Sequence, residues 1–317
     1  MPLEEKRKPQ PKKLRQKNKE LPLGGILVID KPAGLSSHDI VGRLKLYLNI
    51  SRIGHAGTLD PFATGVLLVC VGRATRLVPW LTAVQKRYTA KLVFGMTSTT
   101  DDTEGECTKT GGTLPTLEEV KAILPQFQGT ITQRPPIFSA IRVEGRRAYK
   151  IARGGRVVEM PERTVEILHL DILGAEENDE GRLISLDLDV TCGSGTYIRS
   201  LARDIGEALG SGAYLGALRR TAVGEYGIDE AIAMKKERNA DDGATLLRRV
   251  IPAGLARINA PAISLDATES ARFLQGQRLA GRTEPESESM AIRDPKGHLL
   301  GFAAIRGEVL HPLVVLG

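Results

Sequence analysis

A glycine-punctuated loop that runs straight into an unbroken apolar segment is the feature that most constrains how this chain folds. Residues 54–65 read Gly-His-Ala-Gly-Thr-Leu-Asp-Pro-Phe-Ala-Thr-Gly, and residues 66–71 are all apolar. Such a run is typical of a strand buried on both faces of a sheet. Pro61 favours extended geometry at the residue before it. The sequence therefore predicts one carboxylate, Asp60, held rigidly beside a core strand, as a nucleophile or general base requires.

An Asp-Pro pair alone is a common turn dipeptide, so the interpretation of Asp60 depends on the motifs that accompany it. Four occur in order: Asp-Lys-Pro-Ala-Gly-Leu-Ser-Ser at 30–37, Pro-Pro-Ile-Phe-Ser-Ala at 135–140, Gly-Arg-Arg-x-Tyr-x-x-Ala-Arg at 145–153 and Gly-Thr-Tyr-Ile-Arg-Ser-Leu at 195–201. Together with the Asp60 loop they resemble the motifs of the TruB-type pseudouridine synthases, which modify the T-arm of tRNA. The resemblance spans nearly the whole of residues 22–230.

This resemblance implies that a uridine in the T-loop of tRNA, at position 55, is flipped out of its stack and isomerised to pseudouridine. Asp60 matches the essential aspartate of the family, and Arg199 matches the arginine that pairs with it and keeps it ionised. The reaction breaks a C–N bond and forms a C–C bond without importing energy, so we expect no cofactor and no metal.

Three further residues match places that support the active site in the family. Tyr88 would stack on the flipped uracil or assist removal of its C5 proton, with a buried core tyrosine as the competing interpretation. Tyr197 would position Arg199. His55 would fill the space that the flipped base leaves, although a lone histidine is more often a polar turn residue.

A basic segment with interleaved aromatic side chains is typical of surfaces that bind single-stranded or loop RNA. Residues 135–163 have this composition and resemble the RNA-clasping insertion of the family. For Lys31, a lysine in a solvated turn is an equally good interpretation. The residues expected to bind RNA are Lys31, Arg73, Arg76, Arg142, Arg146, Arg147, Tyr149, Lys150 and Arg153.

Composition and resemblance together suggest three parts. Residues 1–20 hold eight Lys or Arg and three Glu, which favours a disordered basic tail, either phosphate-binding or merely solubilising. The resemblance implies an α+β catalytic domain over 21–250, built on a mixed and mostly antiparallel sheet. Short glycine-bounded segments over 255–317 indicate a small β-barrel-like module, similar to a PUA-like RNA-binding domain. Pro252 to Pro261 reads as a linker between them.

Composition also narrows the class of protein. No run of 18 apolar residues occurs, so no membrane-spanning helix is expected. The polar N-terminus lacks the apolar region of a secretory signal. Three scattered cysteines and five scattered histidines indicate reduced thiols and no metal site. We therefore expect a cytoplasmic monomer that binds the T-arm of tRNA and has no obligate protein partner.

Three alternatives stay open at this point. The first is a guide-dependent relative that acts on ribosomal RNA, against which the compact insertion and the short C-terminal region argue. The second is a non-catalytic protein that folds or binds tRNA. The third is a structural RNA-associated protein, which would have no use for the Asp60 carboxylate. Activity on an isolated T-arm, without guide RNA, would separate the tRNA enzyme from these alternatives.

Overall fold

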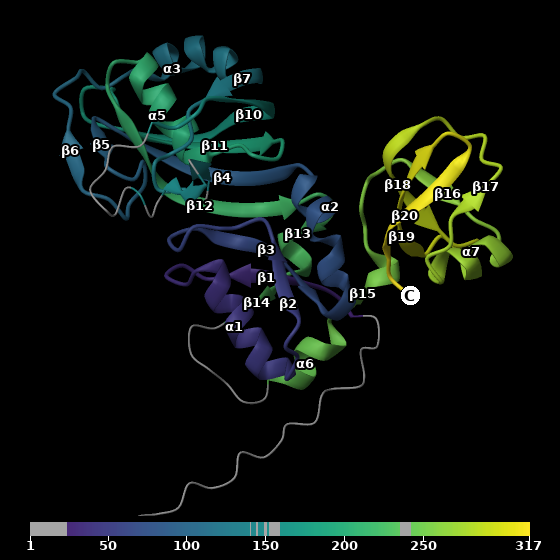
Figure 1. Cartoon of the computed structure of the whole chain (residues 1–317). Helices are drawn as coiled ribbons and strands as arrows, with labels where there is room; N and C mark the ends of the chain where they lie inside the picture. Colours follow the sequence, from purple (N-terminus) through teal and green to yellow (C-terminus); the bar gives the residue numbers. More distant parts are fainter. Residues whose placement is uncertain (1–23, 140, 144, 149–150, 152–158, 235–241) are drawn as a thin grey trace, which may run out of the picture.

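The computed structural model describes residues 24–139, 141–143, 145–148, 151, 159–234 and 242–317. Within them the chain forms a large mixed sheet with helices on its faces and a smaller C-terminal sheet beside it (Figure 1). The predicted basic tail, residues 1–20, lies outside the described residues. Among the described segments, no helix has the length and apolar content needed to cross a membrane.

The large sheet has eleven strands, and all of its pairings are antiparallel except β1 with β14 and β3 with β12. This confirms the predicted mixed, mostly antiparallel sheet. Its main path runs in the order β14 (Ile232–Ala233), β1 (Gly25–Lys31), β3 (Thr64–Val71), β12 (Ala213–Val223), β4 (Lys86–Phe94), β11 (Leu183–Cys192), β10 (Arg163–Glu177) and β7 (Gly129–Gln133). Beside this path, β2 (Ile53–Ala56) pairs with β3, β13 (Tyr226–Gly227) with β12, and β15 (Ile251–Pro252) with β1.

Strand β3 is the centre of the core, as its unbroken apolar sequence predicts. Leu67, Val69 and Val71 pack into one apolar cluster, while Val66, Leu68 and Cys70 pack into a second cluster on the other face. All six side chains are fully buried. Each such residue contributes about 1.5–3 kcal/mol of hydrophobic stabilisation. The loop that carries Asp60 is therefore attached to one of the most firmly held strands of the molecule.

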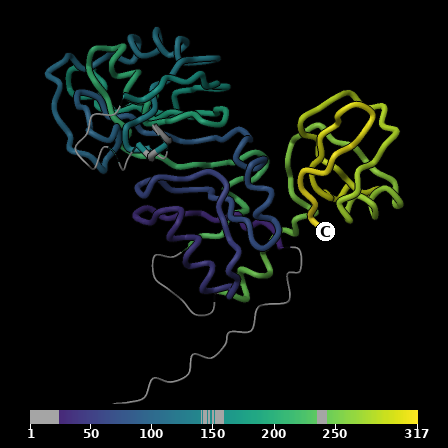
Figure 2. Tube along the Cα trace, in the orientation of Figure 1, coloured from purple at the N-terminus to yellow at the C-terminus, as the bar shows by residue number. Residues whose placement is uncertain are grey.

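Helices cover the faces of this sheet. The sequence Ser-x-x-Asp forms a capping box at the start of α1 (Ser37–Leu48): the Asp39 amide donates to Ser36 Oγ at 3.1 Å, and the Ser36 amide donates to Asp39 Oδ2 at 2.9 Å. Further helices in the described part of the body include η1 (Gly72–Leu77), α2 (Val78–Ala83), α3 (Leu117–Ile123), η2 (Leu124–Phe127), α5 (Ile198–Ala208), η3 (Ile228–Glu230) and α6 (Asp242–Arg248). Figure 2 shows α6 returning to the N-terminal end of the body, where it packs against α1.

Two small hairpins stand apart from the large sheet. One pairs β5 (Met96–Ser98) with β6 (Cys107–Lys109), and the other pairs β8 (Arg142–Val143) with β9 (Arg146–Arg147). The second lies within the predicted RNA-clasping insertion. The loop between β5 and β6 folds back over the sheet and brings Asp102 against β12, where it forms a bridge with Leu215.

The C-terminal module is a five-stranded sheet with one helix, α7 (Ala267–Leu274). Its strands form an open half-barrel, which agrees with the predicted small barrel-like module. The strands run in the order β16 (Ala262–Ser264), β18 (Ser287–Arg293), β19 (Leu299–Arg306), β20 (Val309–Val315) and β17 (Leu279–Ala280).

The segment predicted as a linker, Pro252 to Pro261, is packed between body and module. It contains η4 (Ala253–Leu255), and Ala253, Ala256 and Ile258 are buried in the second apolar cluster. That cluster continues into the module, where Trp80 of α2 stacks on Phe302 with ring centroids 4.1 Å apart. Apolar burial, which composition alone does not reveal, therefore fixes the module on the body.

Candidate active site

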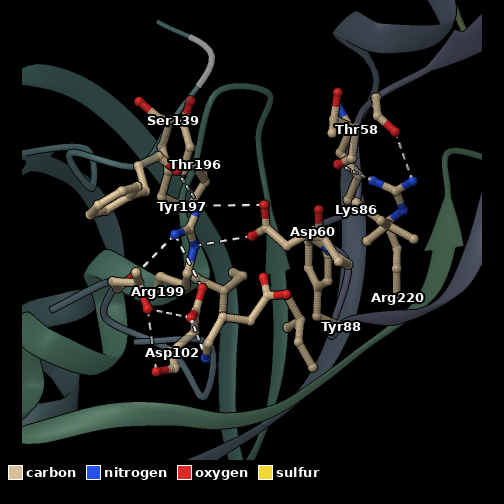
Figure 3. Close-up of a pocket in the computed structure, with 18 of the residues that line it drawn as sticks. Thr58, Asp60, Lys86, Tyr88, Asp102, Ser139, Thr196, Tyr197, Arg199 and Arg220 are labelled. Carbon is tan, nitrogen blue, oxygen red and sulfur yellow. Dashed lines mark hydrogen bonds and ion pairs between the residues drawn. The ribbon is translucent and has the colours of Figure 1, made fainter. Parts of the chain in front are cut away.

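A cleft of about 1090 Å³ opens over the large sheet where β12 meets β3 and β4 (Figure 3). The Asp60 loop, β4, the β5–β6 loop, residues 138–139, the turn before α5 and the end of β12 all contribute to its walls. The lining residues that matter below are Asp60, Lys86, Tyr88, Asp102, Glu104, Phe138, Ser139, Tyr197, Arg199 and Arg220.

The backbone of the loop that carries Asp60 is anchored to neighbouring elements on both sides of Asp60. Ser37 Oγ donates to the Leu59 carbonyl at 3.1 Å and accepts from the Leu59 amide at 2.9 Å. Gly65 has φ +101°, and a Cβ there would lie 2.1 Å from the carbonyl oxygen of Arg220, so only glycine fits where the loop meets β12. These contacts fix the backbone on both sides of Asp60.

Arg220 ties the same loop to β12. Its guanidinium donates to the carbonyls of Val66 at 2.7 Å, Gly57 at 3.0 Å and Thr58 at 3.5 Å. The side chain is 1% exposed. Sequence reasoning missed Arg220, because an arginine at the end of a strand gives no sign that it turns inward toward carbonyls more than 150 residues earlier in the chain.

Asp60 and Arg199 lie in contact, as the resemblance implies. Arg199 Nε lies 3.0 Å from Asp60 Oδ2, but its N–H is not aimed along that line, so the contact is an ion pair without a good hydrogen bond. A longer hydrogen bond runs from Nη2 to Asp60 Oδ1 at 3.4 Å. The Asp60 side chain is 33% exposed while that of Arg199 is 5% exposed, so the carboxylate faces the cleft and the arginine supports it from behind.

A second carboxylate, Asp102, holds the other side of Arg199. Its Oδ2 lies 3.2 Å from Arg199 Nη1, and its side chain is 2% exposed. Nη1 also donates to the Thr100 carbonyl and Nη2 to the Phe138 carbonyl, each at 3.0 Å. The whole fork of Arg199 is thus occupied. Sequence reasoning missed Asp102, because in the sequence it is only one of several polar residues in a Thr- and Asp-rich loop.

The electrostatics of the site pull Asp60 in opposite directions. Burial raises the pKa of Asp60 above its ordinary 3.8, the charge of Arg199 lowers it, and the charge of Asp102 raises it again. The net shift of this pKa is upward, so Arg199 offsets only part of the cost of burial. Burial likewise raises the pKa of Glu104, whose carboxylate also lines the cleft.

The two tyrosines of the prediction both line the cleft. Tyr88 is 8% exposed and packs in the core cluster, so its ring belongs to both core and cleft. Burial raises its pKa and keeps its hydroxyl protonated. Tyr197 precedes α5, and Gln133 holds its backbone by accepting from its amide at 3.1 Å and donating to its carbonyl at 3.3 Å. It is thereby fixed two residues before Arg199.

His55 is in a different position from the other predicted residues. It lies on β2, opposite Val69, and is not among the residues that line the cleft. Its Nδ1 is buried and has no hydrogen-bond partner among the described residues. Burial lowers its pKa and so favours the neutral ring.

Lys31 contradicts the prediction of a phosphate contact. It is fully buried, and its ammonium donates to the carbonyls of Leu35 at 2.7 Å, Pro32 at 3.0 Å and Pro61 at 3.2 Å. These three acceptors use all three of its protons. The physical reason is that Lys31 ties the turn after β1 to the Asp60 loop, which neither interpretation of the sequence had foreseen.

The remaining residues predicted to bind RNA lie on η1, on the β8–β9 hairpin or outside the described residues. Arg73 and Arg76 of η1 are exposed, and Arg76 donates to the Val315 carbonyl of the C-terminal module at 2.9 Å. The backbone places Arg142, Arg146 and Arg147 on the β8–β9 hairpin, directly after Phe138 and Ser139 of the cleft wall. Tyr149, Lys150 and Arg153 lie outside the described residues. Within the described part of the chain, no group of three His, Cys, Asp or Glu side chains is placed to hold a metal.

Three family models match successive parts of the chain. Residues 45–198 match the N-terminal domain of the TruB family of pseudouridylate synthases. Residues 199–253 match the C-terminal domain of tRNA pseudouridylate synthase B, and residues 261–316 match the C-terminal region of pseudouridine synthase II, TruB.

Similar proteins extend over almost the full length. The tRNA pseudouridine synthase B of Trichormus variabilis is 40% identical over 294 residues, which are 92% of this chain and 98% of the relative. That of Mycobacterium tuberculosis strain H37Rv is 40% identical over 306 residues, which are 91% of this chain and 98% of the relative. Among solved structures, a Cbf5-Nop10-Gar1 complex contains a chain with a TM-score of 0.71 and 25% identity, over 92% of this chain and 85% of the other.

Proposed function

The chain belongs to the TruB family of tRNA pseudouridine synthases, which are isomerases, and from this premise we propose that it converts the uridine at position 55, in the T-loop of tRNA, into pseudouridine. The observation that carries the proposal is Asp60, one-third exposed in the cleft and backed by an ion pair with Arg199 at 3.0 Å. The fixed loop gives this carboxylate a defined direction into the cleft, as a nucleophile or base requires.

The reaction needs access, a catalyst and confinement. Uridine becomes pseudouridine when the N1–C1′ bond breaks, the uracil turns, and C5 bonds to C1′. A base stacked in a folded RNA arm must first be flipped out, at a cost of a few kcal/mol. The cleft volume of about 1090 Å³ leaves room for a whole nucleotide to enter and for the detached base to turn.

Each group of the site has a part in this proposal. Asp60 acts on the target nucleotide as nucleophile or base. Arg199 favours the ionised form of Asp60 and, through the carbonyls of Thr100 and Phe138, joins the walls of the cleft. Tyr88 supplies a ring on which the uracil stacks. Tyr197 positions Arg199, and His55 occupies the space that the flipped base leaves in the T-loop.

We assign recognition of the RNA arm to the β8–β9 hairpin and to the C-terminal module. The β8–β9 hairpin follows the cleft wall in the chain, and we assign its arginines to the phosphates that flank a flipped nucleotide. We assign residues 21–250 as the catalytic domain and residues 255–317 as a PUA-like RNA-binding domain. Arg73 adds an exposed cation on η1.

The test offers the purified protein a T-arm hairpin with tritium at C5 of its uridines. Formation of pseudouridine exchanges the C5 hydrogen, so tritium is released, and the modified position is then mapped. We expect release from the hairpin alone and modification at position 55 only. Activity that requires an added guide RNA, or modification elsewhere in the arm, would contradict the proposal. Binding without tritium release would favour a non-catalytic tRNA-binding protein.

A further inference from the structure

Two cations beside the cleft, Lys86 and Arg220, are buried without a carboxylate partner. Lys86 is 7% exposed and Arg220 is 1% exposed. The ammonium of Lys86 donates to the carbonyls of Thr82 and Val84. Arg220 donates to carbonyls of the Asp60 loop and of β3, and its side chain also interacts with the Tyr88 hydroxyl. In the described part of the chain, neither side chain forms an ion pair. Arg199 differs from both, because Asp60 and Asp102 flank it.

The sheet register brings these two cations together around Tyr88. Arg220 of β12 is the direct partner of Tyr88 of β4, and partnered residues of antiparallel strands point to the same face. Lys86 lies two residues before Tyr88 and therefore also points to that face. All three residues line the cleft. In Figure 3, Lys86 and Arg220 lie on one side of Asp60, and Arg199 lies on the other.

Positive charge without a countercharge is costly to bury. Backbone carbonyls satisfy hydrogen bonds but carry no net charge, so the cost of desolvating two neighbouring cations is only partly offset. The pKa of Lys86 reflects this cost: burial and then the charge of Arg220 lower it to about 8, and only Cys192 of β11 acts in the other direction. A negative charge that enters the cleft with the substrate would complete the site.

We propose that Lys86 and Arg220 stabilise the negative charge that develops on the uracil ring as it leaves the ribose. Two of the three ammonium protons of Lys86 are used by carbonyls, and the third has no acceptor among the described residues, so it can meet a carbonyl oxygen, O2 or O4, of the uracil. Arg220 adds fixed positive charge beside it. A charge that exists only during the reaction gains most from preorganised groups in a site that excludes water. This inference rests on the proposed function.

The electrons and protons of the step balance within the substrate. When the C1′–N1 bond breaks, its electron pair stays with the uracil, where N1, O2 and O4 share the charge. C5 then uses an electron pair of the ring to form the bond to C1′. The proton on C5 leaves to a base, and N1 gains a proton in the product. No oxidant, reductant or second substrate takes part.

The test compares two leaving groups in one variant. Lys86→Gln removes the charge while its amide keeps two donors for the Thr82 and Val84 carbonyls. Its single-turnover rate is measured on a T-arm hairpin that carries either uridine or 5-fluorouridine at the target, by loss of the parent nucleoside. Fluorine withdraws electrons, so the 5-fluorouracil anion needs less stabilisation. We expect a loss of about 100-fold on uridine and about tenfold or less on 5-fluorouridine, with hairpin affinity within about twofold of wild type.

The matched control is Lys91→Gln, on the same strand. The side chain of Lys91 is 37% exposed and lies near Glu176 on the opposite face of β4, so its replacement should change neither rate. If Lys86→Gln does not fold, Lys86→Met gives the same comparison, because methionine is uncharged and has about the length of the lysine side chain.

Three results would overturn the inference. An equal loss on both substrates would assign Lys86 a structural role at the end of α2. A loss of affinity with an unchanged saturated rate would show that Lys86 meets a backbone phosphate. If the wild-type protein leaves both hairpins unchanged, the proposed function itself fails. That result is distinct from failure of the leaving-group role, which shows only in the comparison of Lys86→Gln with an active wild-type protein.

Discussion

At the scale of single residues, the centre of the site is one arginine, Arg199, that forms ion pairs with two carboxylates. Arg199 places its Nε and Nη2 beside Asp60 and its Nη1 beside Asp102, and it also donates to two loop carbonyls. Such an arrangement depends on the planar fork of the guanidinium, which lysine lacks. The geometry of Arg199 is therefore more important than its charge alone.

Replacing Arg199 with lysine tests this geometry. Arg199→Lys keeps one positive charge but cannot reach Asp60, Asp102 and both carbonyls at once. We expect kcat to fall about 100-fold, the scale of losing one preorganised donor, with a smaller change in KM. Steady-state kinetics on the T-arm hairpin measure both values. The matched control is Arg182→Lys, because Arg182 forms a partly exposed ion pair with Glu119 and neither residue lines the cleft. If Arg199→Lys is as active as this control, Arg199 has no part in the mechanism.

The pH dependence follows from the upward shift of the Asp60 pKa. A protonated carboxyl is neither nucleophile nor base, so activity should fall as the pH decreases, at a midpoint above the ordinary 3.8. The charge of Asp102 contributes to that rise. Asp102→Asn should therefore move the acid limb of kcat/KM to lower pH, whatever its effect on the maximal rate. A limb that stays in place or moves upward would contradict this electrostatic account.

At the scale of elements, the sequence predicted the parts whose signals are local. The apolar run of β3 appears as the strand that its sequence predicts. The capping box of α1 and the alternation of β4 likewise depend only on residues a few positions apart. Asp60 and Arg199 were found through motifs. Lys31, Asp102 and Arg220 could not be interpreted correctly, because their burial depends on carbonyls and charges from distant segments. Periodicity and composition carry no information about such contacts.

The β8–β9 hairpin is the element from which we expect most of the salt-dependent binding. Its arginines, Arg142, Arg146 and Arg147, follow directly on the cleft wall. Replacing all three with alanine should weaken hairpin binding and reduce the slope of log affinity against log salt by up to about 3, because each phosphate contact adds about 0.9. The single-turnover rate at saturation should be unchanged. An unchanged salt slope would mean that this hairpin does not meet phosphate.

At the scale of the whole molecule, the C-terminal module is joined to the body by a built interface. Trp80 stacks on Phe302, its Nε1 donates to Ser289 Oγ at 2.8 Å, and Arg76 donates to the carbonyl of Val315. The packed segment 253–258 continues the same apolar cluster. Deleting the module would expose this surface, so point substitutions at the interface are the cleaner test of its role.

Trp80→Ala should loosen the module without touching the cleft. We expect a loss of about 2 kcal/mol in the free energy of unfolding, less than the 3–5 typical of a fully buried aromatic side chain because Trp80 is only partly buried. KM for tRNA should rise while kcat is largely retained. Ser289→Ala is the matched control: it removes only the hydrogen bond and should cost about 1 kcal/mol. Denaturant unfolding and kinetics give both readouts, and a stable Trp80→Ala protein with unchanged KM would separate the interface from RNA binding.

The central claim is that the Asp60 carboxylate performs the isomerisation, and single-turnover tritium release from a T-arm hairpin tests it most directly. Asp60→Asn keeps the shape of the side chain but can act neither as nucleophile nor as base. The control is Asp171→Asn, an exposed aspartate on β10 beside His169. We predict that Asp60→Asn binds the hairpin with near wild-type affinity and releases tritium at least about 1000-fold more slowly, while the control is unaffected. A rate within about tenfold of wild type, which is about 1.4 kcal/mol of barrier, would contradict the account.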